Sequence, residues 1–79
     1  MNSGIFYTKE YGSIQLHLDE IMQERGINRN QLAKQIGSRF EVINNWCKGD
    51  VERIDLDVLA RICCVLDCSV SDLLEYKKD

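Results

Sequence analysis

Residues 40–48 contain polar side chains whose types and spacing suit hydrogen bonding to the edges of nucleic-acid bases. If this segment is a helix with Ile43, Trp46 and Cys47 turned inward, its outward face and flank carry Glu41, Asn44, Asn45 and Lys48. An amide can pair with N6 and N7 of adenine, a carboxylate can accept from N4 of cytosine, and a lysine can reach guanine or a phosphate. The same residues are ordinary on a solvated helix surface, so this pattern alone leaves both interpretations open.

Arginines flank this segment in the chain. Arg39 comes just before it, where a guanidinium can reach a guanine or a phosphate. Arg29 lies near the start of the preceding helical segment, whose first N–H groups also suit phosphate binding. From Arg25 to Arg53 six basic residues stand against three acidic ones, although the whole chain has a net charge of -3. The sequence therefore predicts a locally basic face on an acidic body.

Four cysteines and one histidine raise the question of a metal site. Cys63 and Cys64 point about 100° apart on a helix, and the chain has neither a CxxC pair nor a second histidine. We therefore interpret the cysteines as small core residues with free thiols, and His17 as a residue that precedes or caps a helix. We find no nucleophile–base pair, no paired carboxylates and no phosphate-binding glycine loop. The sequence predicts no enzyme, no metal and no other cofactor.

Five helical segments are expected to position the polar side chains, at about residues 17–25, 28–37, 40–48, 55–66 and 69–74. Each is bounded by a start or stop signal. The starts are Asn28 with Gln31, Asp55, and Ser69 with Asp72, and the stops are Gly26, Gly37 and Gly49. The fourth segment has a wide apolar face made of Leu56, Leu59, Ala60, Ile62, Cys63 and Leu66.

The two ends of the chain lack helical spacing. Met1–Ser13 is interpreted as an extended arm or short strand, and Tyr76–Asp79 as a solvated tail. The sequence thus predicts an all-α protein, with a compact five-helix domain over residues 14–79 and an N-terminal arm over residues 1–13.

The second and third segments are joined by about three residues around Gly37, which is the connection of a helix-turn-helix. Any helical hairpin can show this spacing, so it is weakly specific. Residues Gln31–Gly37, followed by Ile43 and Gly49 at intervals of six, and the string Asp57–Leu74 together resemble the Cro/cI-type helix-turn-helix, or XRE, family. The resemblance covers about Leu18 to Leu74.

This resemblance implies a lambda-repressor-like fold that binds double-stranded DNA, normally as a symmetric homodimer on a palindromic operator. It implies a transcriptional regulator, and a repressor in our leading interpretation, with the helix at 40–48 in the major groove. Arg29 is implied to contact the DNA backbone. Phe40 and Glu41 stand where phage repressors often have polar amides, so they join the candidate DNA-binding set although Phe40 also suits a rim residue packed on the core.

A second hypothesis is a protein-interaction module, such as an antitoxin or adaptor, that has this fold but binds DNA weakly. The acidic body, Glu41 and the aromatic arm motivate it. RNA binding is less favoured because no stacking aromatic residue lies on the basic face. A homodimer contact is expected from either the Phe6–Tyr11 arm or the surface of the fifth helix, and the sequence does not choose between them.

No apolar run is long enough to span a bilayer, and the N-terminus lacks the pattern of a signal peptide. We therefore expect a cytoplasmic protein without a membrane partner. The chain also leaves no room for a separate domain that binds an inducer, so no small-molecule ligand is expected.

Overall fold

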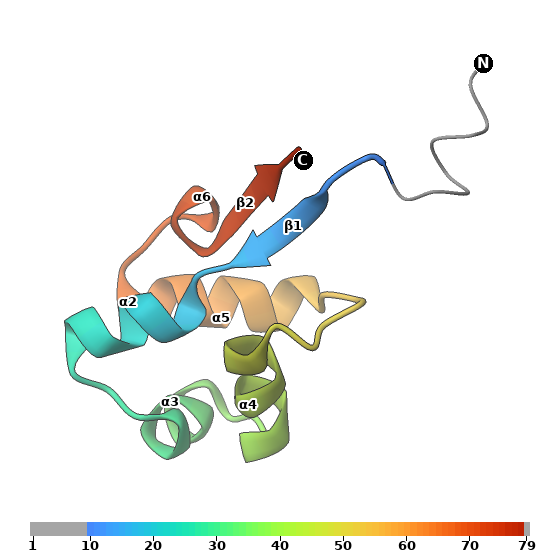
Figure 1. The fold of residues 1–79 in the computed structure, drawn as a ribbon. Coiled ribbons are helices and arrows are strands. Elements are labelled where there is room, and N and C mark those ends of the chain that lie inside the picture. The colour runs from blue at the N-terminus through green and yellow to red at the C-terminus, as the bar shows by residue number, and fades with distance from the viewer. Residues whose placement is uncertain (1–9, 79) are drawn as a thin grey trace.

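The computed structural model describes residues 10–78, which form five helices and one two-stranded sheet (Figure 1). In chain order these are β1 (Ser13–Leu16), α2 (Leu18–Arg25), α3 (Arg29–Ile36), α4 (Phe40–Lys48), α5 (Leu56–Leu66), α6 (Val70–Leu73) and β2 (Leu74–Lys77). The five predicted helices are confirmed, and the predicted bounds of the third match α4 at both ends. The fifth is short because the chain leaves it after Leu73 to form a strand.

Side chains close the N-termini of three helices as the sequence predicts. Asn28 accepts a hydrogen bond from the Gln31 N–H at 2.8 Å, and the Gln31 side chain accepts from the Asn28 N–H at 2.9 Å. Ser69 and Asp72 form the same reciprocal capping box on α6. Asp55 accepts from the first N–H groups of α5. These bonds satisfy amides that a helix start leaves unpaired, and so they fix where each helix begins.

The core lies where α2, α3, α4 and α5 meet, with Leu73 of α6 added from the other end of the chain. Its five fully buried large side chains come from five different helices: Leu18, Leu32, Ile43, Ile62 and Leu73. The face predicted for α5 is too wide, because Leu56 is 75% exposed and Ala60 is also exposed. Leu56 is the first residue of α5, at the end of a helix that packs through its middle and last turns.

Two arginines join helices that are distant in sequence. Arg61 of α5 donates to the Ile36 carbonyl at the end of α3 at 2.9 Å, and Arg25 of α2 donates to the Leu66 carbonyl at the end of α5 at 2.9 Å. Both guanidiniums meet carbonyls that a helix C-terminus leaves unpaired, where a positive charge is also favoured. They hold α3 and α5 in fixed positions relative to their neighbours.

The ends of the described chain pair with each other, which corrects the prediction of a solvated tail. β1 and β2 are antiparallel, with Ile14 opposite Tyr76 and Leu16 opposite Leu74. The fold is therefore mostly helical with a small sheet, and β1 runs across the predicted boundary between arm and domain. Residues 1–9 of the predicted arm, including Phe6, lie outside the described residues. We call this pair of strands the ribbon.

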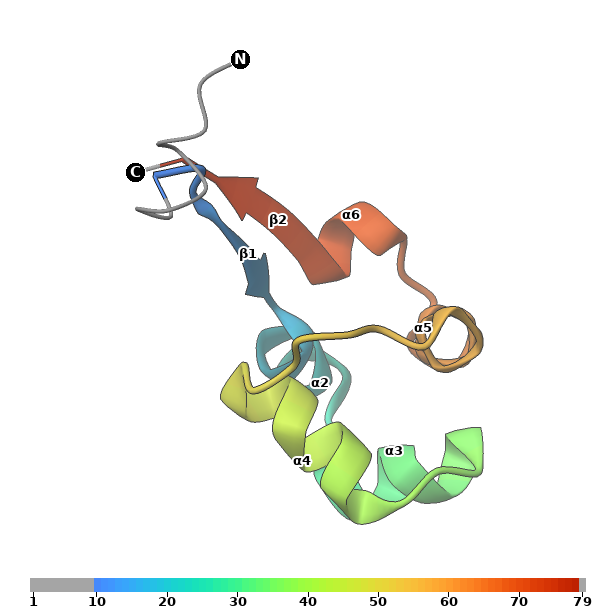
Figure 2. The same ribbon diagram turned by 90° about the vertical axis from the view of Figure 1, so that its right-hand side faces the viewer.

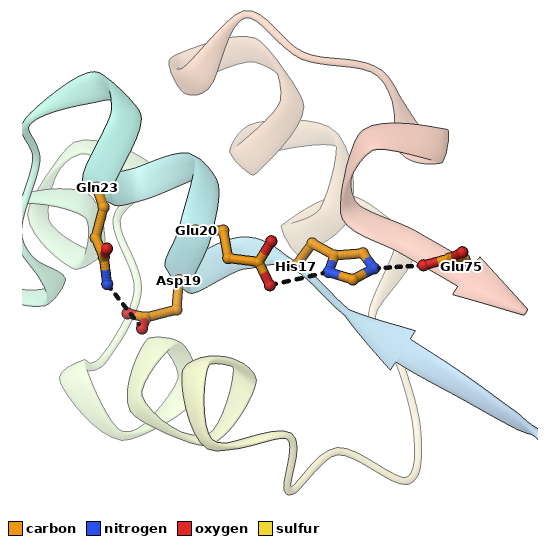
Figure 3. A network of polar contacts seen from close by, with 5 residues as sticks. All are labelled: His17, Asp19, Glu20, Gln23 and Glu75. Carbon is orange, nitrogen blue, oxygen red and sulfur yellow. Dashed lines mark hydrogen bonds and ion pairs between the residues drawn. The ribbon is translucent and has the colours of Figure 1, made fainter. Parts of the chain in front are cut away.

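His17 connects the ribbon to the helices (Figure 3). Its Nδ1 lies 3.1 Å from a Glu20 carboxylate oxygen on α2, and its Nε2 lies 2.8 Å from a Glu75 oxygen on β2. These two carboxylates raise the pKa of His17, the Glu20 hydrogen bond having the larger effect. His17 stands at the N-cap position of α2 as predicted, but its side chain makes no cap hydrogen bond and bridges two elements instead.

Candidate nucleic-acid interface

The connection between α3 and α4 holds the two helices at a fixed angle. Gly37 ends α3 in the left-handed region at φ 70°, and the Ser38 N–H returns to the Ala33 carbonyl at 2.8 Å. A left-handed residue at this place favours glycine, so the chain turns within three residues before α4 begins. The two helices lie together at one end of the molecule, and the ribbon lies at the other end in both views (Figures 1 and 2).

Helix α4 is anchored through Ile43 and Trp46, which are both buried. This anchoring turns Glu41, Asn45 and Lys48 outward, and all three are exposed as the helical spacing predicts. Their side chains form no hydrogen bond or ion pair within residues 10–78. Three different polar groups, an amide, a carboxylate and an ammonium, are thus free to bind an external partner from one helix face.

Asn44 differs from its neighbour because it is half-buried and paired. Arg29 of α3 donates from Nη1 to the Asn44 Oδ1 at 2.5 Å. The Arg29 Nη2 lies 3.6 Å from Asp19 of α2. The structure therefore brings two predicted site residues together. One N–H donor of Arg29 is occupied by the bond that joins α3 to α4.

Phe40 occupies the start of α4 and is 41% exposed. It lines a shallow hollow together with the first residues of α3, among them Asn28, Arg29 and Asn30. Its ring is therefore in contact with the domain on one side and with solvent on the other. Arg39, immediately before it, is exposed at the N-cap position of α4, and its side chain makes no cap bond.

The structure adds Arg53 to the candidate residues. Arg53, in the loop after α4, lines a hollow that also includes Asn45. Its guanidinium forms no ion pair within the described part of the chain, although Asp50 and Glu52 line the same hollow. The sequence places Arg53 in the locally basic stretch, which could have pointed to it. The sequence does not show that Arg53 lies near Asn45, because the two residues belong to different elements.

The cysteines are spread over the domain. Cys47, Cys63 and Cys68 are half-buried, whereas Cys64 is exposed, which corrects its interpretation as a core residue. Burial raises the pKa values of the Cys47 and Cys68 thiols. Within residues 10–78 no three His, Cys, Asp or Glu side chains gather closely enough to hold a metal ion. None of the helices described here has the length and apolar character needed to cross a membrane.

Known proteins share this sequence pattern and fold. The Cro/C1-type HTH DNA-binding domain family matches residues 17–79. YozG of Bacillus subtilis (strain 168), an uncharacterized HTH-type transcriptional regulator, is 27% identical over 67 residues, which are 85% of this chain and 80% of the relative. The crystal structure of the transcriptional regulator VanUg matches with a TM-score of 0.67 at 21% identity, over 84% of this chain and 87% of that chain. This structural match shows a shared fold.

Proposed function

The chain belongs to the Cro/C1-type helix-turn-helix DNA-binding family, and from this premise we propose that it represses transcription by binding a palindromic operator as a homodimer. In this proposal α4 enters the major groove of double-stranded DNA and each copy reads one half-site. The supporting observation is the outward face of α4, where Glu41, Asn45 and Lys48 are exposed and unpaired on a helix anchored by a buried tryptophan. As a member of a regulator family, the protein acts by binding and not by catalysis.

The exposed side chains suit separate tasks on DNA. Asn45 is proposed to read adenine, since an amide matches its N6 and N7 groups, and Glu41 is proposed to read cytosine through N4. Lys48 and Arg39 suit a guanine edge or a phosphate. Phe40 is proposed to pack against the sugar–phosphate backbone or a thymine methyl group. These roles follow from residue type and from exposure along α4 and the residue before it.

Contacts to phosphates are proposed to orient the domain on the duplex. The first N–H groups of a helix attract anions, and the start of α3 carries Arg29, which is about one third exposed. Arg53 suits a further phosphate on the other side of Asn45. Such contacts fix the register of the protein, while base contacts choose the sequence. Repression then follows by excluding polymerase from the occupied promoter, in the cytoplasm.

A mobility-shift and footprinting assay on the DNA upstream of the protein's own coding sequence tests this function. We expect one protected region with two half-sites about ten base pairs apart from centre to centre. Replacing Asn45 with alanine should weaken binding to this region by about 1–3 kcal/mol and leave nonspecific binding unchanged. Lys78→Ala is the control, because Lys78 is exposed on the far side of the domain, and it should leave DNA binding unchanged. Equal, weak binding to all DNA would contradict the proposal.

A second candidate function is a protein-interaction module with the same fold. The observation that favours it is Glu41, an exposed carboxylate on the outward face of α4 in a chain of net charge -3, because phosphates repel carboxylates. Stable co-purification with one protein partner, together with no shift of any genomic fragment, would support this candidate over operator binding.

A further inference from the structure

A groove lined by both apolar and polar side chains runs along β1, beside the C-terminal end of α4. Its apolar lining comes from Ile14 and Leu16 of β1 and from Val51 and Ile54 of the loop before α5, and it has a volume of about 550 Å³. Cys47, Lys48 and Gly49 line the end that touches α4, and Glu52 lies in the loop. Figure 2 views the molecule from the side on which β1 and this loop lie close together. We call this surface the β1 groove.

One face of the ribbon carries apolar side chains that the core does not bury. Because side chains alternate along a strand, the cross-strand pairs Leu16–Leu74 and Ile14–Tyr76 share one face. The first pair packs against the core, but Ile14 is 58% and Tyr76 57% exposed. The apolar face therefore continues beyond the core. The Tyr76 hydroxyl donates to the Tyr11 carbonyl at 2.6 Å, whereas Ile14 leaves more than half of its surface exposed to solvent.

We propose that the β1 groove is the two-fold contact between two copies of this chain, with Ile14 of each copy covered by the other. This inference rests on the proposed function, which requires two copies of the chain. It places their contact on a different surface from the two that the sequence suggests, the arm and the fifth helix. Two equal surfaces that meet around a two-fold axis must be complementary to themselves.

The charges at the groove meet this requirement. Lys48 and Glu52 both line it, so a two-fold rotation can bring the lysine of each copy toward the glutamate of the other. The hollow between α2 and α6 is unlike it, because its three carboxylates outnumber its basic groups, Arg25 and His17; the carboxylates are those of Glu20, Glu24 and Asp72. A second copy of an acidic chain would be repelled from that side, whereas the β1 groove combines apolar side chains with one charge of each sign.

The position of the groove also fits a dimer that binds one duplex. Because residues 47–49 line it, contact there brings the C-terminal ends of the two α4 helices toward each other. Glu41 and Arg39 lie at the other end of α4, away from the contact. Each α4 thus keeps Arg39, Glu41 and Asn45 for DNA, as two half-sites on one duplex require. In this arrangement Lys48 serves the contact between the copies instead of the DNA contact proposed for it above.

Sedimentation or light scattering of the purified full chain, without DNA, tests the interface. We expect a dimer for the unmodified protein, and for Ile14→Glu a rise in the dimer dissociation constant on the order of tenfold or more, since a charge would be buried in the contact. Val70→Glu is the matched control, because Val70 is also an exposed apolar residue, at 49%, and lies outside the groove. Circular dichroism checks that both variants remain folded.

A charge exchange gives the second measurement. Glu52→Lys and Lys48→Glu should each weaken self-association, because each leaves like charges facing across the two-fold axis. An equimolar mixture of the two variants should restore the dimer, since one copy then supplies two basic and the other two acidic residues. Restoration only in the mixture is the expected result.

Two outcomes overturn the interface: dimerisation of Ile14→Glu that is as strong as that of Val70→Glu or stronger, or an unmodified protein that stays monomeric and still binds its operator. The second outcome leaves the proposed DNA binding intact. A dimer that needs Ile14 but shifts no DNA would instead reject the proposed function and keep the interface, so the two failures are distinguishable.

Discussion

Arg29 on the first turn of α3 donates a hydrogen bond to Asn44 in the middle of α4, and this bond separates the roles of two neighbouring asparagines. Asn44 is half-buried with its oxygen occupied, whereas Asn45 is exposed with a free amide. The adjacent residues share a type and differ by one helical step of about 100°. The first belongs to the packing between the two helices and the second to the surface offered to a partner.

Asn44→Ala should therefore destabilise the fold, whereas Asn45→Ala should leave its stability almost unchanged. Asn44→Ala removes the acceptor of a partly buried hydrogen bond to a charged group and should lower the free energy of unfolding by about 1–3 kcal/mol. Asn45→Ala should change it by less than about 0.5 kcal/mol, as exposed substitutions usually do. Urea unfolding followed by circular dichroism measures both values. If the two variants were equally stable, the Arg29–Asn44 bond would not hold α3 and α4 together.

Arg39 and Arg53 are expected to contact phosphates on either side of the outward face of α4. Each contact releases a counterion on binding, so removing one arginine should reduce the slope of log binding constant against log salt concentration by about 1. Arg39→Ala and Arg53→Ala should therefore weaken binding to operator and to unrelated DNA alike. Fluorescence anisotropy over a series of salt concentrations measures the slope, and Lys78→Ala serves as the control with the slope of the unmodified chain. An unchanged slope for Arg53→Ala would remove that residue from the interface.

The helices could be predicted from the sequence because their signals are local. Each capping box lies within four residues, and the apolar spacing of residues 43–47 fixes which face of α4 is buried. The exposure of Glu41, Asn45 and Lys48 follows from that spacing alone. For this reason α4 and the exposed part of its surface match the expectations closely.

The ribbon and the pairing of Asn44 depend on contacts between distant residues. β1 and β2 are each four residues long and are separated by the whole helical domain, so neither has a local hairpin signal. Arg29 and Asn44 are fifteen positions apart and lie on different helices. Periodicity gives the face of a residue but not its partner across a helix packing, so the sequence alone groups Asn44 with Asn45.

Gly12 allows the chain to enter β1 close to the end of β2. It has a φ of 86°, and a Cβ atom there would lie 2.4 Å from the backbone oxygen of Lys77. Gly12→Ala should therefore force the strand ends apart and reduce amide protection in the ribbon, at a cost on the order of 1–3 kcal/mol. Gly26→Ala is the control, since Gly26 also has a positive φ but a Cβ added there would meet no atom within 4 Å, so it carries backbone strain without the clash. Hydrogen exchange of residues 13–16 measures the difference. Equal protection in the two variants would show that the close approach to β2 is not required.

The His17 bridge makes the attachment of the ribbon depend on pH. Hydrogen bonds to Glu20 and Glu75 raise the pKa of His17 above its ordinary value of 6.5, so the folded chain holds the proton more tightly than the unfolded chain. The stabilisation is fully present below the unfolded-state pKa, as long as the carboxylates stay ionised, and is lost as the pH rises through the folded-state pKa. The hollow beside His17 is also lined by Glu24, Arg25 and Asp72, whose charges stay constant over this pH range.

Glu75→Gln tests this pH dependence, because glutamine keeps the length of the side chain and removes its charge. The free energy of unfolding of the unmodified chain should exceed that of Glu75→Gln most in mildly acidic buffer, and the difference should shrink as the pH rises through the folded-state pKa of His17. Urea unfolding at several pH values gives the two curves, and an NMR titration of the His17 ring gives the pKa directly. Lys77→Gln, a charge-removing change on the same strand away from His17, is the control and should show a difference that varies little with pH. Parallel curves for the unmodified chain and Glu75→Gln would mean that the proton on His17 does not hold β2 to α2.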